Sequence, residues 1–481
     1  MENLNGDSLE GGKVPLVDLK REYRAAIDGT HDERYEALRA RRYYDGEQWT
    51  KSELKVLRDR KQPIITINRS RRKVNGLVGY EIRRRTDPIA LPKDEKSGKM
   101  ANTASKVMRS VEESIKLDKR VTRAFRNLLV EGSGIIEMGV EQRKGKYYAT
   151  AKHVPWEMFY HDPRSRDEGF EDCSYMGLGE WMSIDEAESR WPEHEDLFIQ
   201  SEDHADGYYD DEASEDRPRY RWYDETRKRV RVIQHWRRQG KDWYYYTFTG
   251  AGIMEEGKSP YVCAQSGNTY CPLYPQSCYI DQYNQRYGIM RDLFSPQDEI
   301  NQRRSKLLHK ISEKQFFYTK GSVSNPAKIK NELKKPDGVI EIEHGQLGQD
   351  FGVLEDRAGI QGQVELLQEA KGEIDVQGLN PTLLGRTDGA VSGRAILASQ
   401  DGALAEEALI FEQLSEWKVR LYHGIWNIIK QFYTDERDER ISGDDKATKF
   451  IGINKTLGVA CLLYTSPSPR DRTRSRMPSS A

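Results

Sequence analysis

The chain has 481 residues, of which 32% are charged and 36% hydrophobic, and its net charge at neutral pH is −2. This length exceeds what one hydrophobic core supports, so two or more modules are expected. The near-neutral charge argues against a protein that grips nucleic acid by neutralising phosphates. No stretch approaches eighteen apolar residues and no N-terminal apolar segment follows a basic cluster, so neither a membrane span nor a signal peptide is expected.

The reactive residue types form no recognisable catalytic or metal-binding set. Of the five cysteines, Cys263, Cys271 and Cys278 are too widely spaced for a CxxC zinc pair. In a chain without a secretion signal, reduced thiols are the default. The nine histidines form no Ser/His/Asp or Cys/His arrangement at a usable spacing. The sequence therefore predicts a protein that is not an enzyme, with no metal and no cofactor.

The N-terminal part contains one helical stretch and then three distinct blocks. Residues 16–42 alternate apolar and charged positions, which is consistent with an exposed helix. The first block is the aromatic and acidic run Tyr43-Tyr44-Asp45-Gly46-Glu47-Gln48-Trp49. The second, 63–69, starts with proline and is rich in β-branched isoleucine, which favours a strand. In the third, four apolar residues share one helical face: Val74, Leu77, Val78 and Ile82.

The order of these three blocks resembles the portal protein of tailed phages, most closely the short-tailed podovirus type. Each block alone also fits an ordinary helix–strand–helix core, so the specificity lies in their order. The resemblance implies a ring through which DNA enters and leaves a capsid. Family members form dodecamers at one capsid vertex, nucleate assembly with scaffolding protein and dock the terminase motor.

A long helix and a hairpin come next. The apolar stripe Val107, Val111, Ile115, Val121, Phe125 and Leu128 predicts one helix of about six turns, ending at the sequence Gly132-Ser133-Gly134. Residues 135–138 and 147–152 then read as a β-hairpin. The segment 154–163 again resembles podovirus portals.

Residues 193–216 hold eleven aspartates or glutamates, which indicates a solvated acidic loop more than a divalent-ion site. Residues 219–249 alternate basic with aromatic and β-branched residues around the sequence Gly240-Lys241-Asp242, which predicts a β-hairpin with a basic, aromatic face. Such a face can bind nucleic acid. The acidic loop just upstream is the nearer partner, so a structural role is favoured.

The segment 252–259 matches the phosphate-loop pattern GxxxxGKS literally. That chemistry requires a buried strand before the loop and a helix after it. Pro260 comes directly after the segment, and Glu255 and Glu256 would repel a phosphate. A chance match is therefore expected, against the alternative of an ATP-driven packaging enzyme.

The second half is expected to start with a polar helix. Ser295 is a candidate N-cap, with Pro296 at the first helical position and acidic residues in the first turn. A helix this polar suggests packing against copies of itself. By the resemblance it is the stem that lines the channel, and its candidate charges are Arg303, Arg304, Lys306 and Lys310.

The resemblance also assigns roles to the segments after the stem. Phe316-Phe317-Tyr318 and residues 336–342 would supply a small α/β clip that contacts terminase and later the tail. A returning helix then leads to a glycine-rich tunnel loop and the Ser-Gly-Arg-Ala-Ile entry of a long helix. The candidate channel residues are Gly385, Arg386, Thr387, Asp388, Gly389, Ser392 and Arg394.

From residue 461 the composition changes abruptly. Residues 461–471 correspond to the translation of a transposase-type sequencing adapter, and residues 475–481 to the flow-cell end of the same adapter. Residues 472–474 occupy the place of the sample index. A basic, Ser/Pro-rich disordered tail is the conventional alternative. The adapter interpretation predicts that the native protein continues differently after about residue 460.

Together these patterns predict an α+β fold of the portal type. The implied divisions are a wing or hip region at 1–284, a stem helix at 285–315, a clip at 316–360, a returning stem helix at 361–382, a tunnel loop at 383–393, a long helix at 394–434 and the start of a further C-terminal region at 435–460. The implied partners are further copies of the chain, major capsid protein, scaffolding protein, the terminase large subunit, head-completion or tail adaptor proteins, and double-stranded DNA in the channel, with no membrane. Assembly would take place in the host bacterial cytoplasm and the product would be part of the virion. The competing class is a nucleic-acid-binding module that uses the basic face of 219–238.

Overall fold

The computed structural model describes residues 14–92, 98–201, 221–312, 315–323, 325–333, 338–342, 344–346, 348–354, 357–377, 408–434, 437–442, 448–453 and 462–464. The chain divides into two compact units. Unit 1 consists of Met1–Ala40, Val78–Ile289 and Leu404–Ala481. Unit 2 consists of Arg41–Leu77 and Met290–Ala403.

Unit 1 is built around two antiparallel sheets. The larger has six strands in the order β4-β5-β7-β8-β9, with β6 also paired to β7. Its strands are β4 (Phe159–His161), β5 (Tyr175–Ser183), β6 (Tyr223–Asp224), β7 (Arg229–Gln239), β8 (Asp242–Phe248) and β9 (Ile253–Lys258). The smaller has the order β10-β2-β3, from β2 (Ser133–Arg143), β3 (Lys146–Val154) and β10 (Leu273–Ser277). Both hairpins predicted from sequence are confirmed, and β2 and β3 are longer than expected.

Each hairpin turn uses residues that accept a left-handed backbone. Lys144 and Gly145, between β2 and β3, have φ of 51° and 77°. That is the pattern of a type I′ turn, which matches the twist of the flanking strands. Gly240, between β7 and β8, has φ of 62° and lies first in its two-residue turn, where a type II′ turn favours glycine.

The N-terminal helical stretch differs from the prediction. It forms two helices, α1 (Leu16–Gly29) and α2 (His31–Asp45), interrupted at Thr30. It is also not exposed, because Leu19, Tyr23 and Ala26 are buried. They pack in a core cluster with residues of the larger sheet such as Ile233 and Phe248. Burial of these apolar positions explains why a helix with so many charges is held in place.

The predicted helix around 107–128 is also two helices, α5 (Gly98–Ile115) and α6 (Leu117–Glu131). The break is Lys116, whose φ of 51° cannot continue a right-handed helix. The apolar stripe carries across the break, so periodicity alone did not reveal it. The end at Gly132, with φ of 91°, agrees with the prediction.

The remaining elements of unit 1 are short, apart from the long helix α13 (Ala408–Phe432). The apolar residues of this segment recur at helical spacing and predict one stripe, of which Leu414, Leu421, Ile425 and Ile428 are buried. The others are α7 (Ile184–Arg190), α8 (Glu195–Gln200), the 3-10 turns η2 (Trp156–Met158) and η3 (Pro192–His194), and the strand pairs β1 (Ile89–Leu91) with β17 (Leu462–Tyr464), β11 (Tyr279–Ile280) with β12 (Arg286–Tyr287), and β15 (Arg437–Ser442) with β16 (Thr448–Ile453). Strand β17 lies in the segment that reads as a translated adapter.

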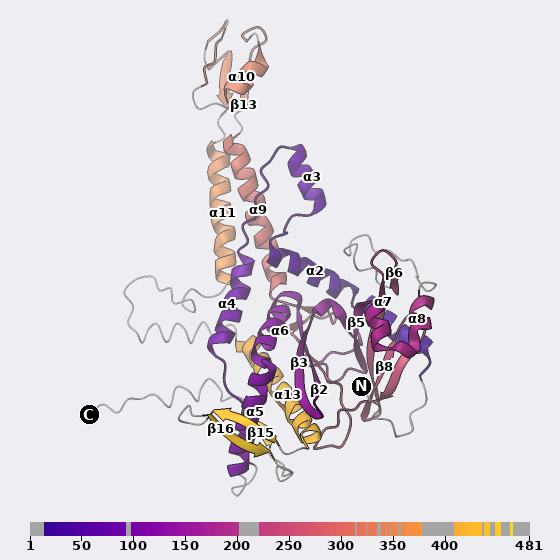
Figure 1. Cartoon of the computed structure of the whole chain (residues 1–481). Coiled ribbons are helices and arrows are strands. Elements are labelled where there is room, and N and C mark those ends of the chain that lie inside the picture. Colours follow the sequence, from indigo (N-terminus) through magenta and orange to yellow (C-terminus); the bar gives the residue numbers. More distant parts are fainter. Residues whose placement is uncertain are drawn as a thin grey trace, which may run out of the picture. The chain divides into compact units, whose positions relative to one another are not determined.

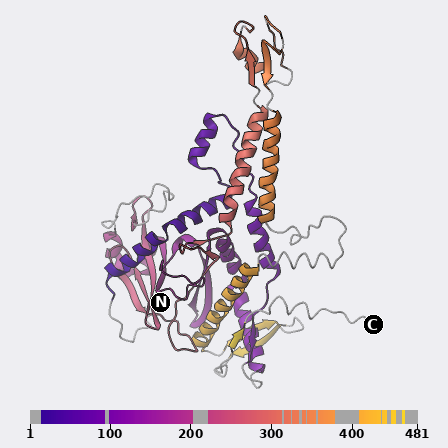
Figure 2. The same ribbon diagram turned by 180° about the vertical axis from the view of Figure 1, so that it is seen from behind.

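Unit 2 contains a helical hairpin with a small α/β element at its tip. Its helices α9 (Met290–Ser312) and α11 (Arg357–Gln377) lie side by side in Figure 1 and, seen from behind, in Figure 2. Ile300 and Leu307 of α9 share a buried core with Leu367, Ala370 and Ile374 of α11. Between the two helices in the chain come β13 (Gln315–Tyr318), α10 (Pro326–Glu332) and β14 (Phe351–Leu354). The unit also holds α3 (Lys51–Asp59), and α4 (Ser70–Arg83) begins in it.

Three expectations for unit 2 and α4 are corrected. Helix α9 begins at Met290, so Ser295 is not its N-cap and Pro296 lies inside the helix. The helix starts earlier because Leu293 and Phe294 are buried, and Phe294 packs against Tyr43 with ring centroids 4.7 Å apart. Residues 63–69 form no strand. On α4, Val74, Leu77 and Val78 are buried as predicted but Ile82 is exposed.

Candidate functional site

Helix α9 carries the predicted stem charges, and its surface has three distinct faces. One face is apolar and packs on α11 through Ile300 and Leu307. A second is polar and buried, made of Gln297, Asn301 and Ser305, which succeed one another at intervals of four residues. The third carries most of the charge, at intervals of three or four residues, and consists of Glu299, Arg303, Lys306 and Lys310.

The structure thus brings three of the four predicted stem charges onto one face and separates the fourth. Arg303 is held by Glu299, with its Nε 2.5 Å from Oε1 of that carboxylate. Lys306 is exposed, and Lys310 is half-buried. Arg304 lies about 40° round the helix from Ile300, at the edge of the apolar face. It is half-buried there.

The buried polar face of α9 holds the segment 63–70. Gln297 accepts hydrogen bonds from the backbone N–H of Arg69 (3.0 Å) and Ser70 (3.3 Å). Asn301 accepts one from the N–H of Ile67 at 2.9 Å. Ser305 donates to the carbonyl of Pro63. Side chains of α9 therefore satisfy backbone groups that a neighbouring strand would otherwise satisfy, which is why this β-prone segment does not join a sheet.

The aromatic block before this segment is tied to the same helix. Asn301 donates to Oε1 of the buried Gln48 at 2.6 Å, and Tyr43 donates to Asp298. Asn68 donates to the carbonyls of Tyr43 and Tyr44 (3.1 and 2.9 Å). Two of the three sequence blocks that suggested a family thus support helix α9 from the side. Sequence reasoning missed this role, because Gln297 and Asn301 lie more than 220 residues away from their partners.

The element at the tip of the hairpin has a small core and some exposed apolar side chains. Val323, Ile329 and Phe351 are buried together. Four large apolar side chains are exposed instead: Phe317, Tyr318, Val339 and Val353. In this element β13 and β14 pair with each other.

The candidate tunnel-loop residues Gly385, Arg386, Thr387, Asp388, Gly389, Ser392 and Arg394 lie outside the described residues, as does most of the acidic loop.

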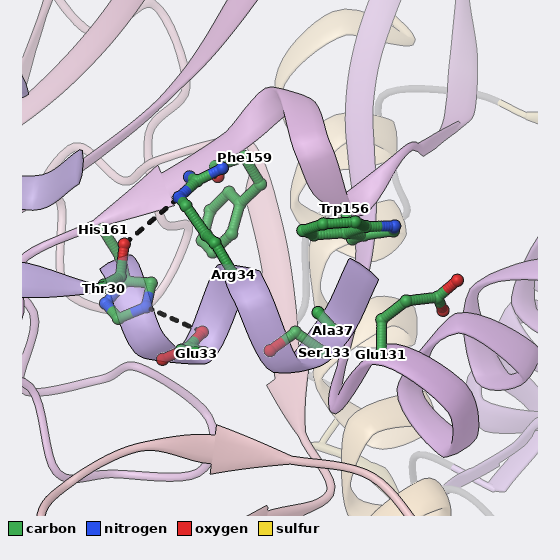
Figure 3. A pocket seen from close by; sticks show the side chains of 9 residues that line it. All are labelled: Thr30, Glu33, Arg34, Ala37, Glu131, Ser133, Trp156, Phe159 and His161. Atoms are coloured by element: carbon green, nitrogen blue, oxygen red, sulfur yellow. Dashed lines mark hydrogen bonds and ion pairs between the residues drawn. The ribbon is translucent and has the colours of Figure 1, made fainter. Parts of the chain in front are cut away.

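Unit 1 contains a small cavity, drawn in Figure 3, between α2 and the strands around β4. Its volume of about 20 Å³ suits a single water molecule. His161 Nε2 lies 3.6 Å from Glu33 Oε1, and Arg34 donates to the carbonyl of Phe159. Burial alone would raise the pKa of Glu33, but His161 and the charge of Arg286 hold that pKa below its ordinary value. The cavity is too small for an organic ligand, and its charges serve to fix α2 against the sheet.

Comparison with known proteins bears directly on this architecture. A family model described as phage P22-like portal protein matches residues 20–242 and 237–474. The chain belongs to the P22-like phage portal protein family. It is also 20% identical over 441 residues to a portal protein of Helicobacter pylori bacteriophage KHP30, an alignment that covers 91% of this chain and 69% of that protein. The family match runs to residue 474, and the adapter interpretation of 461–481 stays a prediction.

Portal proteins are a structural class, and the phosphate-loop pattern of this portal chain has a structural explanation. The segment 252–259 coincides with β9, which pairs antiparallel with β8. Lys258 Nζ lies 2.8 Å from Asp242 Oδ2, and Ser259 donates to the carbonyl of Tyr270 at 2.7 Å. The chain after it, residues 260–272, contains no helix whose N–H groups could hold a phosphate. The match is a coincidence of sequence, as expected.

The basic, aromatic face of β7 is likewise occupied from within unit 1. Arg229 pairs with Asp224 at 2.8 Å, and Arg237 with Glu22 at 3.3 Å. The guanidinium of Arg231 lies 4.6 Å from the centroid of a Trp181 ring. Among the described residues the acidic partners of this face are Asp224 and Glu22, whereas most of the acidic loop that the sequence suggested lies outside the described residues. These contacts favour the structural role of the face.

Across the described residues of this portal chain, no group of three or more His, Cys, Asp or Glu side chains is placed to hold a metal ion. Nor is any described helix long and apolar enough to span a membrane.

Proposed function

We propose that the chain assembles into a closed ring at one capsid vertex and that double-stranded DNA passes through this ring during packaging and ejection. The observation that carries the proposal is the helical hairpin of α9 and α11 in a chain of the portal family. A two-helix element with charged outer faces is a weak fold on its own and gains stability when copies pack side by side. The number of copies expected for a ring of this family is twelve.

In this proposal the hairpin is the stem and the β13–α10–β14 element is the clip. Of the exposed apolar residues, Tyr318 and Val353 share one face of the β13–β14 pair and Phe317 lies on the other, while Val339 belongs to the segment between α10 and β14. This exposed apolar surface supports a role in protein contacts. The clip would dock the terminase large subunit during packaging and head-completion or tail adaptor proteins afterwards. Unit 1 would be the wing that contacts major capsid protein and scaffolding protein. Assembly would occur in the host cytoplasm, and the ring would remain in the virion.

The segment 383–393 is proposed as the tunnel loop, which would lie against the passing duplex together with Arg394 directly after it. Arg386 and Arg394 are the basic residues of this set. Two cations suffice for transient contact with phosphates and are too few to hold DNA firmly. The stem charges Arg303, Arg304, Lys306 and Lys310 are proposed to act within the assembled stem.

The test is the mass and shape of the purified chain. Native mass spectrometry should give a species of about 670 kDa, twelve times the 55.7 kDa chain. Electron microscopy of the same sample should show a closed ring with an axial channel. A chain that stays monomeric at every concentration and salt tested, with or without scaffolding protein, would contradict the proposal.

A further inference from the structure

We infer that neighbouring copies of this chain are held together at the stem by charge, with a basic stripe on α9 of one copy against an acidic stripe on α11 of the next. This contact rests on the proposed ring and is the surface that closes it. The basic stripe consists of Arg303, Lys306 and Lys310, and the acidic stripe of Glu365, Glu369 and Glu373.

The basic stripe is an outward face of the hairpin. Lys306 is exposed and lies about 120° round α9 from the core residue Ile300. With Glu299 included, the face carries three cations and one carboxylate, a net charge of +2. Arg303 has a close carboxylate on its own helix, that of Glu299. The described part of the chain offers Lys306 no ion pair.

The acidic stripe is an outward face of the other helix. Glu365, Glu369 and Glu373 are all exposed and succeed one another at intervals of four residues. Like charges at this spacing repel each other and destabilise an isolated helix by a few tenths of a kcal/mol per pair. Glu365 accepts a hydrogen bond from Gln361 at 3.1 Å, and no cation of the described residues pairs with any of the three. An opposite charge from outside the chain would relieve this repulsion.

The two stripes match in length and in height. At 1.5 Å per residue, the basic stripe extends over about 10 Å and the acidic stripe over about 12 Å. The helices pass through one shared core, in which Ile300 and Leu307 meet Leu367 and Ile374. The stripes flank this core on both helices, so they occupy the same level of the hairpin. Rotation about a ring axis parallel to the stem keeps each residue at the same position along that axis. The stripes of adjacent copies would therefore meet.

A second copy of the chain fits these surfaces better than DNA does. Complementary patches on two different helices of one molecule make a heterologous contact, which closes into a ring when the rotation allows it. DNA would be attracted to the basic stripe but repelled by the acidic one. A copy of the same chain satisfies both stripes at once.

Charge reversal tests the inference with the full-length chain. One variant carries Lys306→Glu with Lys310→Glu, a second carries Glu365→Lys with Glu369→Lys, and a third combines all four changes. Each of the first two should lower the fraction of chain in rings at 0.15 M salt at least tenfold, whereas the combined variant should restore it. The Debye screening length is about 3 Å in 1 M salt. High salt should therefore weaken the repulsion between like charges and partly rescue each two-site variant. Lys144→Glu with Lys146→Glu, at the exposed tip of the β2–β3 hairpin, is the control with the same charge change as the first variant.

Native mass spectrometry gives the ring fraction, and circular dichroism confirms that each variant is folded. Folded variants whose ring fraction equals that of the unmodified chain would overturn the inference, as would a combined variant that fails to recover. If the variant with Lys306→Glu and Lys310→Glu forms intact rings that translocate DNA abnormally, the basic stripe belongs to the channel instead, which also overturns the inference. If the unmodified chain forms no rings at all, the proposed function itself fails, so the two failures are distinguishable.

Discussion

Glu81 and Lys418 form an ion pair of 3.2 Å that is almost withdrawn from solvent, with only 1% of the Glu81 side chain and 15% of the Lys418 side chain exposed. Thr122 donates a hydrogen bond to the second oxygen of Glu81 at 2.8 Å. The three residues belong to α4, α13 and α6, so one buried carboxylate joins three helices that are far apart in sequence.

We predict that Lys418→Met destabilises unit 1 by about 2 kcal/mol, because it removes the closer of the two cations beside the buried Glu81 carboxylate and leaves only Arg85, whose Nε lies 3.5 Å from Oε1. Replacing both partners, Glu81→Leu with Lys418→Met, should cost less than the single change, since no buried charge remains. Urea denaturation of the chain and the two variants measures this. A double variant at least as unstable as Lys418→Met alone would contradict the interpretation.

A second prediction concerns pH. Burial is the main cause that raises the pKa of Glu112 to about 7, and the hydrogen bond from Tyr422 at 2.6 Å opposes it. Asp118 and Asp87 raise the pKa further, and Lys418 lowers it. The folded state therefore holds this proton more tightly than the unfolded state, where the carboxyl titrates near its ordinary value. The stabilising contribution of protonated Glu112 is fully present below about pH 4.5 and is lost as the pH rises towards 7.

Between about pH 5 and pH 8 the free energy of unfolding should accordingly fall, by up to roughly 3 kcal/mol from this residue. Glu112→Gln should flatten the profile and be more stable than the unmodified chain at about pH 8. The adjacent Glu113→Gln is the matched control, since Glu113 is exposed and pairs with Arg109 at the surface. A Glu112→Gln profile parallel to that of the unmodified chain would rule out Glu112 as the titrating group.

The third prediction addresses the support of α9. Asn301→Ala should increase hydrogen exchange at the Ile67 amide, and Gln297→Ala at the Arg69 and Ser70 amides, because each loses its acceptor. Loss of a buried acceptor typically costs about 1–3 kcal/mol. Gln302→Ala, at an exposed position of the same helix, should leave these amides unchanged. If hydrogen exchange changes equally over residues 63–70 in all three variants, the individual hydrogen bonds are not what protects these amides.

The fourth prediction derives from the proposed tunnel loop. Deleting residues 387–391 should leave rings that form normally and yet package or retain DNA poorly. The glycines of this segment allow backbone shapes that other residues adopt only at a cost, so the loop can move against a duplex. Ring yield and packaged DNA length are the two measurements. Rings that fail to form, or that package at the unmodified level, would contradict the assignment.

Sequence patterns predicted the elements that depend on local chemistry. The turns at Gly145 and Gly240, the end of a helix at Gly132 and the apolar stripe of α13 are of this kind, since a few neighbouring residues determine them. Errors arose where distant residues decide the outcome. Residues 63–69 have strand propensity but are bound by Gln297 and Asn301, and Pro296 lies inside a helix because upstream residues are buried. The four basic residues predicted for the stem all lie on α9, but only the helix register shows that Arg304 lies apart from the other three.

The hydrogen bond between Gln48 and Asn301 has an evolutionary consequence. These two amides lie 253 positions apart in sequence and are buried together, so neither can be exchanged for an apolar residue without stranding the other. In related sequences the two positions should therefore change together. Such paired substitution would indicate that the segment equivalent to 43–49 contacts the helix equivalent to α9. It would do so even in distant relatives whose overall similarity is too low to align with certainty.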